Sequence, residues 1–348
     1  MRAAVIQASN AQDPAAAVRF VTDWPDPTAP TTGQVLIRTR CSALNHLDLW
    51  MAKGMMGAHI KYPAISGSDA CGVVEAVGPG VDAAWVGRRV IVNAAVDVDD
   101  VPRPDDPPEI ETPNFRMIGE HFAGMHAELF LAPAANLATV ADTCGDEHAA
   151  AFALSHLTAY SMMVGKAGLR PGQSVLITGI GGGVALAALL LAKYLGCFAI
   201  VTSRSQAKLD LARGLGADAG VLDDGTDWFK QIRTLTSKRG VDLAVDSSGK
   251  ATHLNAVRSL CRGGVYASCG ATSGPDATTD LTRLFWMQLR FVGSTMANNS
   301  EFHQVAALLN NGAITPVLDQ VFKADRFADG ARRLASAEQF GKVVIDWR

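Results

Sequence analysis

Residues 178–196 read TGIGGGVALAALLLAKYLG, a cluster of glycines that leads directly into a run of alanine and leucine. The four residues before it, 174–177 (SVLI), form a short apolar run of the kind found in buried parallel strands. Residues 184–195 have the composition of a helix that is buried on most sides. A helix start presents free backbone N–H groups and the positive end of the helix dipole, which suits a phosphate. The strand–turn–helix order therefore predicts a site for the pyrophosphate of a dinucleotide.

The glycine spacing differs from the usual G-x-G-x-x-G pattern, because Val184 stands where the last glycine is expected. The pattern that fits is Gly179-x-x-Gly182-x-x-Ala185, in which the small Ala185 still allows close packing of the helix. The alternative is a glycine turn that only lets a buried helix pack on a sheet. The residues of this turn that we predict to contact a cofactor are Gly179, Gly181, Gly182, Gly183 and Val184.

Length and composition indicate a globular protein that acts on small molecules. The chain has 348 residues, enough for two domains, with 48% hydrophobic and 19% charged residues. Its formal net charge is −3 with both signs mixed, so it lacks the basic surface expected for nucleic acid or an anionic membrane. The N-terminus is too polar for a signal peptide, and the longest apolar run, 184–192, is too short for a bilayer, which predicts a cytoplasmic protein.

The two halves of the chain differ in their patterns. From residue 171 onward, strand-like and helix-like runs alternate, which predicts an α/β fold with a doubly wound parallel sheet. Residues 1–150 instead hold short strand candidates separated by proline and glycine turns, which predicts a β-rich barrel or sandwich. The strand expected at 341–345 is predicted to return to this first domain. The acidic, proline-rich segment 97–113 is predicted to be an exposed loop.

Several separated segments resemble one family. They are ALNHLDLW at 43–50, GSDACGVVEAVG at 67–78, LTAY at 157–160, the turn at 178–185, GVDLAVDSSG at 240–249 and GKVV at 341–344. Together they resemble the medium-chain dehydrogenase/reductase superfamily, and within it the zinc-free quinone oxidoreductase-like branch. The resemblance implies a GroES-like catalytic domain at 1–150, to which 291–348 returns in part, and a Rossmann domain at 151–290. It also implies a nicotinamide cofactor, a cleft between the domains and a homodimer.

The resemblance also predicts that no zinc is bound. The positions of the three catalytic zinc ligands in the zinc-dependent relatives correspond here to Asn45, Ser68 and Leu154, which do not replace thiolate and imidazole. Leu47 stands at the position of their proton-relay hydroxyl, and segment 97–113 lacks the four cysteines of their structural zinc lobe. Without a Lewis acid, hydride transfer to a quinone or an α,β-unsaturated carbonyl is the favoured reaction.

Three other activities remain open from the sequence. The chain could reduce enoyl thioesters such as acyl-CoA substrates, or act as an alcohol dehydrogenase-like enzyme. A non-catalytic NADPH-binding structural or sensor protein is the alternative from a different class.

The resemblance places several side chains near the substrate. Asn45 is predicted to donate a hydrogen bond to a substrate carbonyl or to the nicotinamide ribose, and Asp48 to organise the active-site loop. Trp50 is predicted to line the substrate pocket, Thr158 to pack behind the nicotinamide, and His46 to reach the pyrophosphate. The alternatives are a helix-cap role for Asn45, core packing for Trp50 and Thr158, and no role for His46. No residue stands out as a proton donor.

The end of the second Rossmann strand indicates which nicotinamide is bound. An acid is expected there if the ribose hydroxyls of NAD are to be held, but residues 197–205 contain none. Ser203, Arg204 and Lys208 instead suit the 2′-phosphate of NADP(H). The alternative is a solvated basic helix start, because the resemblance places Asp223 where relatives often carry a phosphate-contacting tyrosine. Two further cofactor contacts are predicted, at Ser248 and Lys342.

Overall fold

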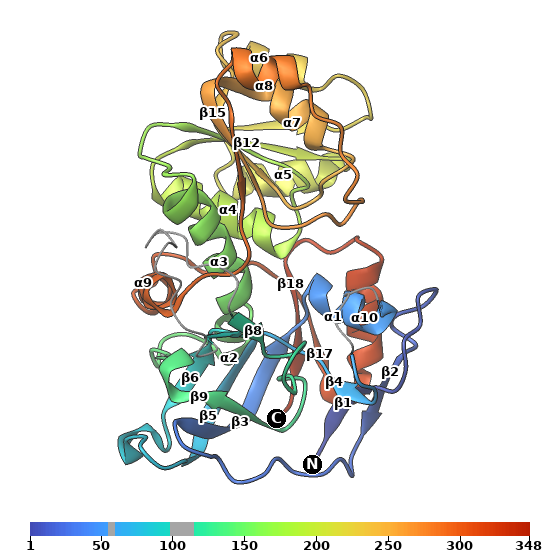
Figure 1. Cartoon of the computed structure of the whole chain (residues 1–348), viewed down its shortest axis with the longest axis vertical. Helices are drawn as coiled ribbons and strands as arrows, with labels where there is room; N and C mark the ends of the chain where they lie inside the picture. Colours follow the sequence, from blue (N-terminus) through green and yellow to red (C-terminus); the bar gives the residue numbers. More distant parts are fainter. Residues whose placement is uncertain (55–59, 98–114) are drawn as a thin grey trace. The chain divides into compact units, whose positions relative to one another are not determined.

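The computed structural model describes residues 1–54, 60–97 and 115–348 (Figure 1). The chain divides into two compact units, one formed by residues 1–154 and 298–348 and the other by residues 155–297. The prediction placed the end of the second unit at residue 290, whereas the structure places it at residue 297. Residues Arg290–Gly293 pair in parallel with the preceding strand and so belong to that unit. The segment expected to form a loop, 97–113, lies almost entirely outside the described residues.

The second unit contains the predicted doubly wound parallel sheet. Its strands are β11 (Ser174–Ile177), β12 (Phe198–Ser203), β13 (Ala219–Leu222), β14 (Val241–Asp246), β15 (Leu260–Ser268) and β16 (Arg290–Gly293). They pair in the order β13-β12-β11-β14-β15-β16, and every pairing is parallel. The central strands are buried on both faces, as their continuous apolar sequences predict.

Helices cover both faces of this sheet (Figure 1). They are α4 (Gly183–Tyr194), α5 (Gln206–Gly214), α6 (Phe229–Leu235), α7 (His253–Ser259) and α8 (Leu281–Trp286). Figure 1 shows α4 and α5 on one side and α6, α7 and α8 on the other. The fully buried Trp228, just before α6, packs with Ile200 and Leu176 of the sheet in one apolar core. The order of strands and helices places the carboxyl ends of β11, β12 and β14 along one edge, where ligands of such sheets bind.

The first unit is rich in β-structure, as predicted. Its strands are β1 (Ala3–Ile6), β2 (Val18–Val21), β3 (Gln34–Ala43), β4 (Ala64–Ile65), β5 (Ala70–Val77), β6 (Arg89–Val92), β7 (Ala95–Asp97), β8 (Phe115–Met117), β9 (Leu129–Pro133), β10 (Leu137–Thr139), β17 (Leu318–Lys323) and β18 (Lys342–Asp346). The largest sheet runs in the order β10-β6-β5-β3-β18-β17, with β9 also paired to β3. The C-terminal strand β18 therefore lies between β3 and β17 in this unit.

Helices of the first unit cover these sheets. They are α1 (His46–Lys53), α2 (Asp146–Ala150), α9 (Asn299–Asn310) and α10 (Phe327–Ala335), and α3 (Ala153–Tyr160) crosses the boundary between the units. Phe327 and Leu334 of α10 are buried against Trp347 and Ile345 at the end of the chain. In the part of the chain that the structure describes, no helix has the length and apolar character needed to cross a membrane.

Two glycines allow chain segments of the first unit to approach closely. Gly124 donates its N–H to the Ile65 carbonyl at 2.9 Å, and a Cβ at Gly124 would overlap the Ser66 carbonyl. Gly67 has φ +112°, and a Cβ there would lie 2.6 Å from the backbone nitrogen of His126. Neither position therefore accommodates a side chain without moving backbone.

We expect Gly124→Ala to destabilise the first unit by about 2 kcal/mol or more, because the added methyl meets a backbone carbonyl that cannot rotate away. Gly145→Ala is the matched control, since its Cβ would lie 3.5 Å or more from other atoms and its φ is −67°. The free energies of unfolding, measured with denaturant, check the prediction. Equal stabilities of the two variants would contradict it.

Candidate functional site

The glycine turn leaves the start of α4 open for a ligand. Gly179 and Gly181 adopt positive φ values of +63° and +121°, which bring the chain sharply from β11 into the helix. Gly182 is the N-cap of α4, and no side chain caps the helix there. A Cβ at Gly182 would meet no atom within 4 Å, so the space above the turn is open. The uncapped N–H groups and this space fit a pyrophosphate.

A buried carboxylate holds the strand ends beneath the turn together. Asp246, at the end of β14, accepts hydrogen bonds from the hydroxyls of Thr178 (2.8 Å), Thr252 (2.8 Å) and Tyr266 (2.9 Å). It also accepts the backbone N–H of Ser248 at 2.7 Å, and a Cβ at Gly179 would lie 3.0 Å from the Ser248 hydroxyl. The sequence analysis did not identify Asp246, although an acid that ends an apolar strand is a detectable signal.

The Tyr266 hydroxyl is part of this hydrogen-bond network around Asp246. Burial and then the neighbouring Asp246 raise the pKa of its hydroxyl above the ordinary value. Its ring also packs edge-on against His253, with the ring centroids 4.7 Å apart. Tyr266 therefore has a structural role in the second unit.

The end of β12 presents one free cation. The Arg204 side chain is exposed and, among the described residues, makes no hydrogen bond or ion pair. Ser203 is 7% exposed and its hydroxyl accepts the Ser205 N–H at 3.1 Å, so it faces inward. Lys208 lies half-buried in the first turn of α5. The backbone N–H of Asp223 donates to the Ser203 carbonyl at 2.8 Å, which places an acid next to the strand end.

A buried ionic cluster lies in the first unit at the start of α1. The Lys342 ammonium donates to Asn45 Oδ1 at 2.5 Å and to Asp69 Oδ2 at 2.8 Å. Asn45 Nδ2 donates to the same carboxylate oxygen at 3.0 Å and to the Ala43 carbonyl at 3.4 Å. The other oxygen of Asp69 accepts the Leu154 N–H at 2.7 Å. All three charged or polar side chains are at most 9% exposed.

These bonds fix the orientation of the Asn45 amide. Because an ammonium only donates, Oδ1 must face Lys342 and Nδ2 must face Asp69. In the structure both hydrogens of the amide therefore point to protein acceptors, and the ammonium of Lys342 binds the same carboxylate. Asp69 is the residue of this cluster that the sequence analysis missed, because its partners lie 24 and 273 residues away.

Asp48 lies in the first turn of α1. Its Oδ2 accepts the backbone N–H of Asn45 at 2.7 Å and lies 3.3 Å from His126 Nε2. Burial alone would raise the pKa of this carboxyl, but the attraction of His126 and the Asn45 hydrogen bond outweigh it, so the pKa is lowered. Asp48 is therefore an ionised, buried anchor of the helix start.

His46 and Trp50 lie half-buried on α1, with their ring centroids 6.5 Å apart. Burial, and then the positive charge of Lys342, lowers the pKa of His46 below its ordinary value. His46 is therefore neutral at pH 7, so any contact with a ligand uses its N–H group or lone pair and not a cation.

Thr158 lies in α3, which continues into a π-helical turn at Ser161–Lys166. Its side chain is 5% exposed, and its hydroxyl lies 3.7 Å from the sulfur of Met296. Irregular turns of this type are frequent at functional sites. The structure is compatible with both packing and a contact behind a bound ring.

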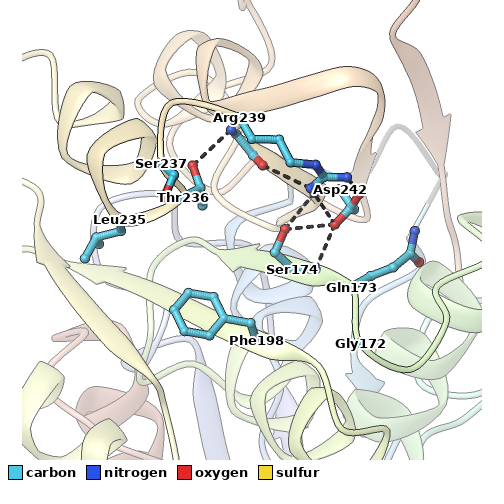
Figure 2. Close-up of a pocket in the computed structure, with 10 residues that line it drawn as sticks. Gly172, Gln173, Ser174, Phe198, Leu235, Thr236, Ser237, Arg239 and Asp242 are labelled. Atoms are coloured by element: carbon cyan, nitrogen blue, oxygen red, sulfur yellow. Dashed lines mark hydrogen bonds and ion pairs between the residues drawn. The ribbon is translucent and has the colours of Figure 1, made fainter.

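A separate hollow of about 460 Å³ lies at the opposite edge of the parallel sheet (Figure 2). Figure 2 shows Asp242 at its floor, where Ser174 Oγ donates to it at 2.9 Å and Arg239 forms an ion pair with it. Phe198 and Leu235 line its apolar side. The polar side chains at the floor satisfy one another, and this edge carries the amino ends of the strands. The hollow is therefore distinct from the glycine turn.

Within the described ranges, no group of three or more His, Cys, Asp or Glu residues is placed to hold a metal ion. Burial raises the pKa of Cys41 and of Cys269 to about 12, so both thiols are protonated near neutral pH. At the positions matched to zinc ligands, Asn45 is bound to an ammonium, Ser68 donates to the Ile118 carbonyl at 2.8 Å, and Leu154 has an apolar side chain. This donor set does not fit zinc.

Comparisons with known proteins identify the family. Residues 31–142 match the alcohol dehydrogenase GroES-like domain, and residues 183–311 match the zinc-binding dehydrogenase family. The zinc-type alcohol dehydrogenase-like protein YogA of Leptosphaeria maculans is 31% identical over 91% of this chain and 92% of its own. Crotonyl-CoA reductase of Streptomyces avermitilis is 28% identical over 90% of this chain and 78% of its own.

A solved NAD-dependent alcohol dehydrogenase has a similar structure throughout. It is 36% identical, with a TM-score of 0.92, and all of both chains is covered. These matches confirm that the β-rich unit is GroES-like and that the parallel-sheet unit is of the Rossmann type. The chain therefore belongs to the medium-chain dehydrogenase/reductase superfamily of oxidoreductases.

Proposed function

We propose that this protein is a zinc-independent oxidoreductase that uses NADPH to transfer hydride to quinones or α,β-unsaturated carbonyl compounds. The observation that carries the proposal is the buried Lys342 ammonium, bound to Asn45 and Asp69 where zinc-dependent relatives are expected to hold their metal. The ammonium of Lys342 is a fixed positive charge in the site, and this charge changes which reactions the site can support. The argument has three steps, which concern the metal, the substrate and the cofactor.

The first step concerns the metal. Asn45 Oδ1 lies 2.5 Å from Lys342 Nζ, so a zinc ion coordinated by Asn45 would lie close to a fixed positive charge. At about 4 Å and an effective dielectric constant of about 20, two unit charges repel by about 4 kcal/mol, and a divalent ion doubles this value. Neither Ser68 nor Leu154 supplies a thiolate or imidazole to offset the repulsion.

The second step concerns the substrate. Bound NADPH would supply a hydride. Addition at the β-carbon of an activated alkene moves negative charge onto a carbonyl oxygen, which ordinary hydrogen-bond donors can stabilise without a metal. The name of the relative crotonyl-CoA reductase denotes an alkene conjugated to a thioester, which supports this class of reaction. Relatives named alcohol dehydrogenases support the alternative of alcohol oxidation.

Tyr266 of the second unit is not the source of the proton in this proposal. Tyr266 donates to Asp246, and its pKa is raised by burial. Solvent water is therefore the proton donor in this proposal.

The third step concerns the cofactor, which is NADP(H). The open start of α4 suits the pyrophosphate, and Arg204 at the end of β12 offers an unengaged guanidinium. Residues 203–205 contain no acid to bind the ribose hydroxyls of NAD. Lys208 adds positive charge in the first turn of α5, whereas the buried hydroxyl of Ser203 faces away from a ligand.

We expect purified protein to oxidise NADPH with a panel of quinones and enones, and to keep this activity after dialysis against a chelator. Absorbance at the NADPH band measures turnover, and elemental analysis measures zinc. Activity only with enoyl thioesters or alcohols would assign one of the alternative reactions. Stoichiometric zinc, or loss of activity in chelator, would overturn the metal-free proposal. Tight NADPH binding without any turnover would favour a sensor or structural protein.

We expect Arg204→Ala to weaken NADPH binding by about 1.5–3 kcal/mol, nearer the lower value because the side chain is exposed. NADH binding should change little, because NADH lacks the 2′-phosphate. Arg213→Ala is the matched control, since it removes the same charge from the exposed C-terminal turn of α5. Fluorescence titration of both cofactors measures the effect. Equal losses for NADPH and NADH would show that Arg204 does not read the phosphate.

We also propose that the protein is a homodimer and that α8 and β16 form its interface. Leu281, Phe285 and Trp286 of α8 are 66–69% exposed, and Phe291 of the edge strand β16 is 39% exposed. β16 is the last strand of its sheet, so its outer backbone groups can pair with another strand. Two copies of one edge strand can pair antiparallel about a two-fold axis, which covers both patches at once.

We expect Phe285→Ser combined with Trp286→Ser to shift the protein from dimer to monomer, because the pair forms the centre of the exposed patch. Leu211→Ser, on a different helix and 53% exposed, is the control. Sedimentation equilibrium measures the mass of each variant. A monomeric wild-type protein, or a double variant that remains dimeric, would exclude this interface.

A further inference from the structure

His126 is a fully buried histidine that neither the family resemblance nor the sequence pattern identified. Its Nδ1 lies 2.8 Å from the Ser42 hydroxyl of β3, and its Nε2 lies 3.3 Å from Asp48 Oδ2 of α1. The ring packs edge-on against Phe327 of α10, with the centroids 4.8 Å apart. The side chain therefore joins three elements of the first unit at the base of α1.

The backbone around His126 prevents the ring from moving away. Its N–H donates to the Ser66 carbonyl at 3.0 Å, and its carbonyl accepts the Ala4 N–H at 2.9 Å. On one side Gly67 has no side chain, and a Cβ there would lie 2.8 Å from the imidazole Cγ. The ring is thus fixed between backbone segments, as a group that positions another residue must be.

The hydrogen bonds determine where the imidazole carries its proton. The Trp347 indole N–H donates to the Ser42 oxygen at 2.9 Å, and an indole can only donate. The hydroxyl hydrogen of Ser42 is then available for His126 Nδ1, 2.8 Å away. Because a lone pair on Nε2 would repel the carboxylate oxygen of Asp48, 3.3 Å away, the geometry favours a hydrogen on Nε2 that faces Asp48.

We infer that His126 is a positioning residue, which holds Asp48 and through it the start of α1 in the geometry required for turnover. Asp48 Oδ2 lies 3.3 Å from His126 Nε2 on one side and accepts the Asn45 backbone N–H on the other. Asn45 in turn binds Lys342 and Asp69. The order of contacts is Trp347 to Ser42 to His126 to Asp48 to Asn45. For its effect on turnover, this inference rests on the proposed reductase activity.

Three variants separate positioning from simple packing. His126→Phe keeps an aromatic ring against Phe327 but leaves Ser42 and Asp48 without their partner. His126→Gln retains a donor for Asp48 and an acceptor for Ser42 in a side chain of similar reach. His303→Phe makes the same change at an exposed histidine of α9 and serves as the control.

We expect His126→Phe to lower kcat about 10–100-fold, because small displacements of aligned groups have effects of this size. The Kd of NADPH should stay within about twofold, because the predicted phosphate and ribose contacts lie in the second unit. His126→Gln should restore kcat to within about threefold of wild type, and His303→Phe should match wild type. A His126→Phe variant that is folded and has the kcat of wild type would overturn the inference. So would a Gln variant that is folded but no more active than the Phe variant.

A second measurement does not depend on activity. In histidine-labelled wild-type protein, nitrogen NMR shifts should show a hydrogen on Nε2 of His126, with the signal assigned by its absence in His126→Gln. The Nδ1–H tautomer would overturn the inference even if turnover is found. If no substrate is reduced, the proposed function fails, while the tautomer still decides whether His126 donates to Asp48.

Discussion

The buried carboxylate of Asp69 is the interaction on which the candidate site depends. It binds Lys342 from β18, Asn45 from the start of α1 and the Leu154 backbone at the start of α3, and it precedes β5 itself. Removing one partner of a buried ion pair typically costs about 3–5 kcal/mol, because the other charge stays buried without compensation. The four segments are therefore constrained to one arrangement, and the start of α1 is placed as a consequence.

The second unit also has a buried carboxylate that binds several chain segments, at the end of one of its own strands. Asp246 collects hydroxyl and backbone donors at the carboxyl ends of β11 and β14, directly below the glycine turn. Its donors are neutral, whereas Asp69 pairs with a cation. In each unit a buried carboxylate thus orders a loop, and predicted site residues are neighbours of that carboxylate. Rigid positioning of this kind is what hydride transfer requires of a protein.

The charges at the candidate site differ from those that the names of the matched families suggest. The matched families are described as alcohol dehydrogenase and zinc-binding dehydrogenase, yet an ammonium lies at Asn45 and protonated thiols are found elsewhere. Positive charge at the cofactor side comes from Arg204, which stands free at the end of β12. The chemistry proposed here follows from these two cations. In the proposal, the first opposes a metal by repulsion and the second favours a phosphate.

The sequence alone determined the architecture, because periodicity and turn residues are local signals. The strand and helix around the glycines were predicted at 174–177 and 184–195, to within a residue of β11 and α4. The short strand β16 was missed, because four residues after an exposed helix carry too little pattern to be recognised. The helix start, the glycine turn and the basic residues after β12 were also visible in the sequence.

The partners of the site residues were decided only by the tertiary structure. Lys342 was predicted as a cofactor contact, but its bond to Asn45 spans 297 residues, and the contact of His126 with Ser42 spans 84. No local pattern encodes such pairs, because the sequence around each side chain is compatible with many folds, and each fold would bring it a different partner. Burial then decides the outcome, because a charge or amide removed from water must bind whichever donor or acceptor the packing brings within reach.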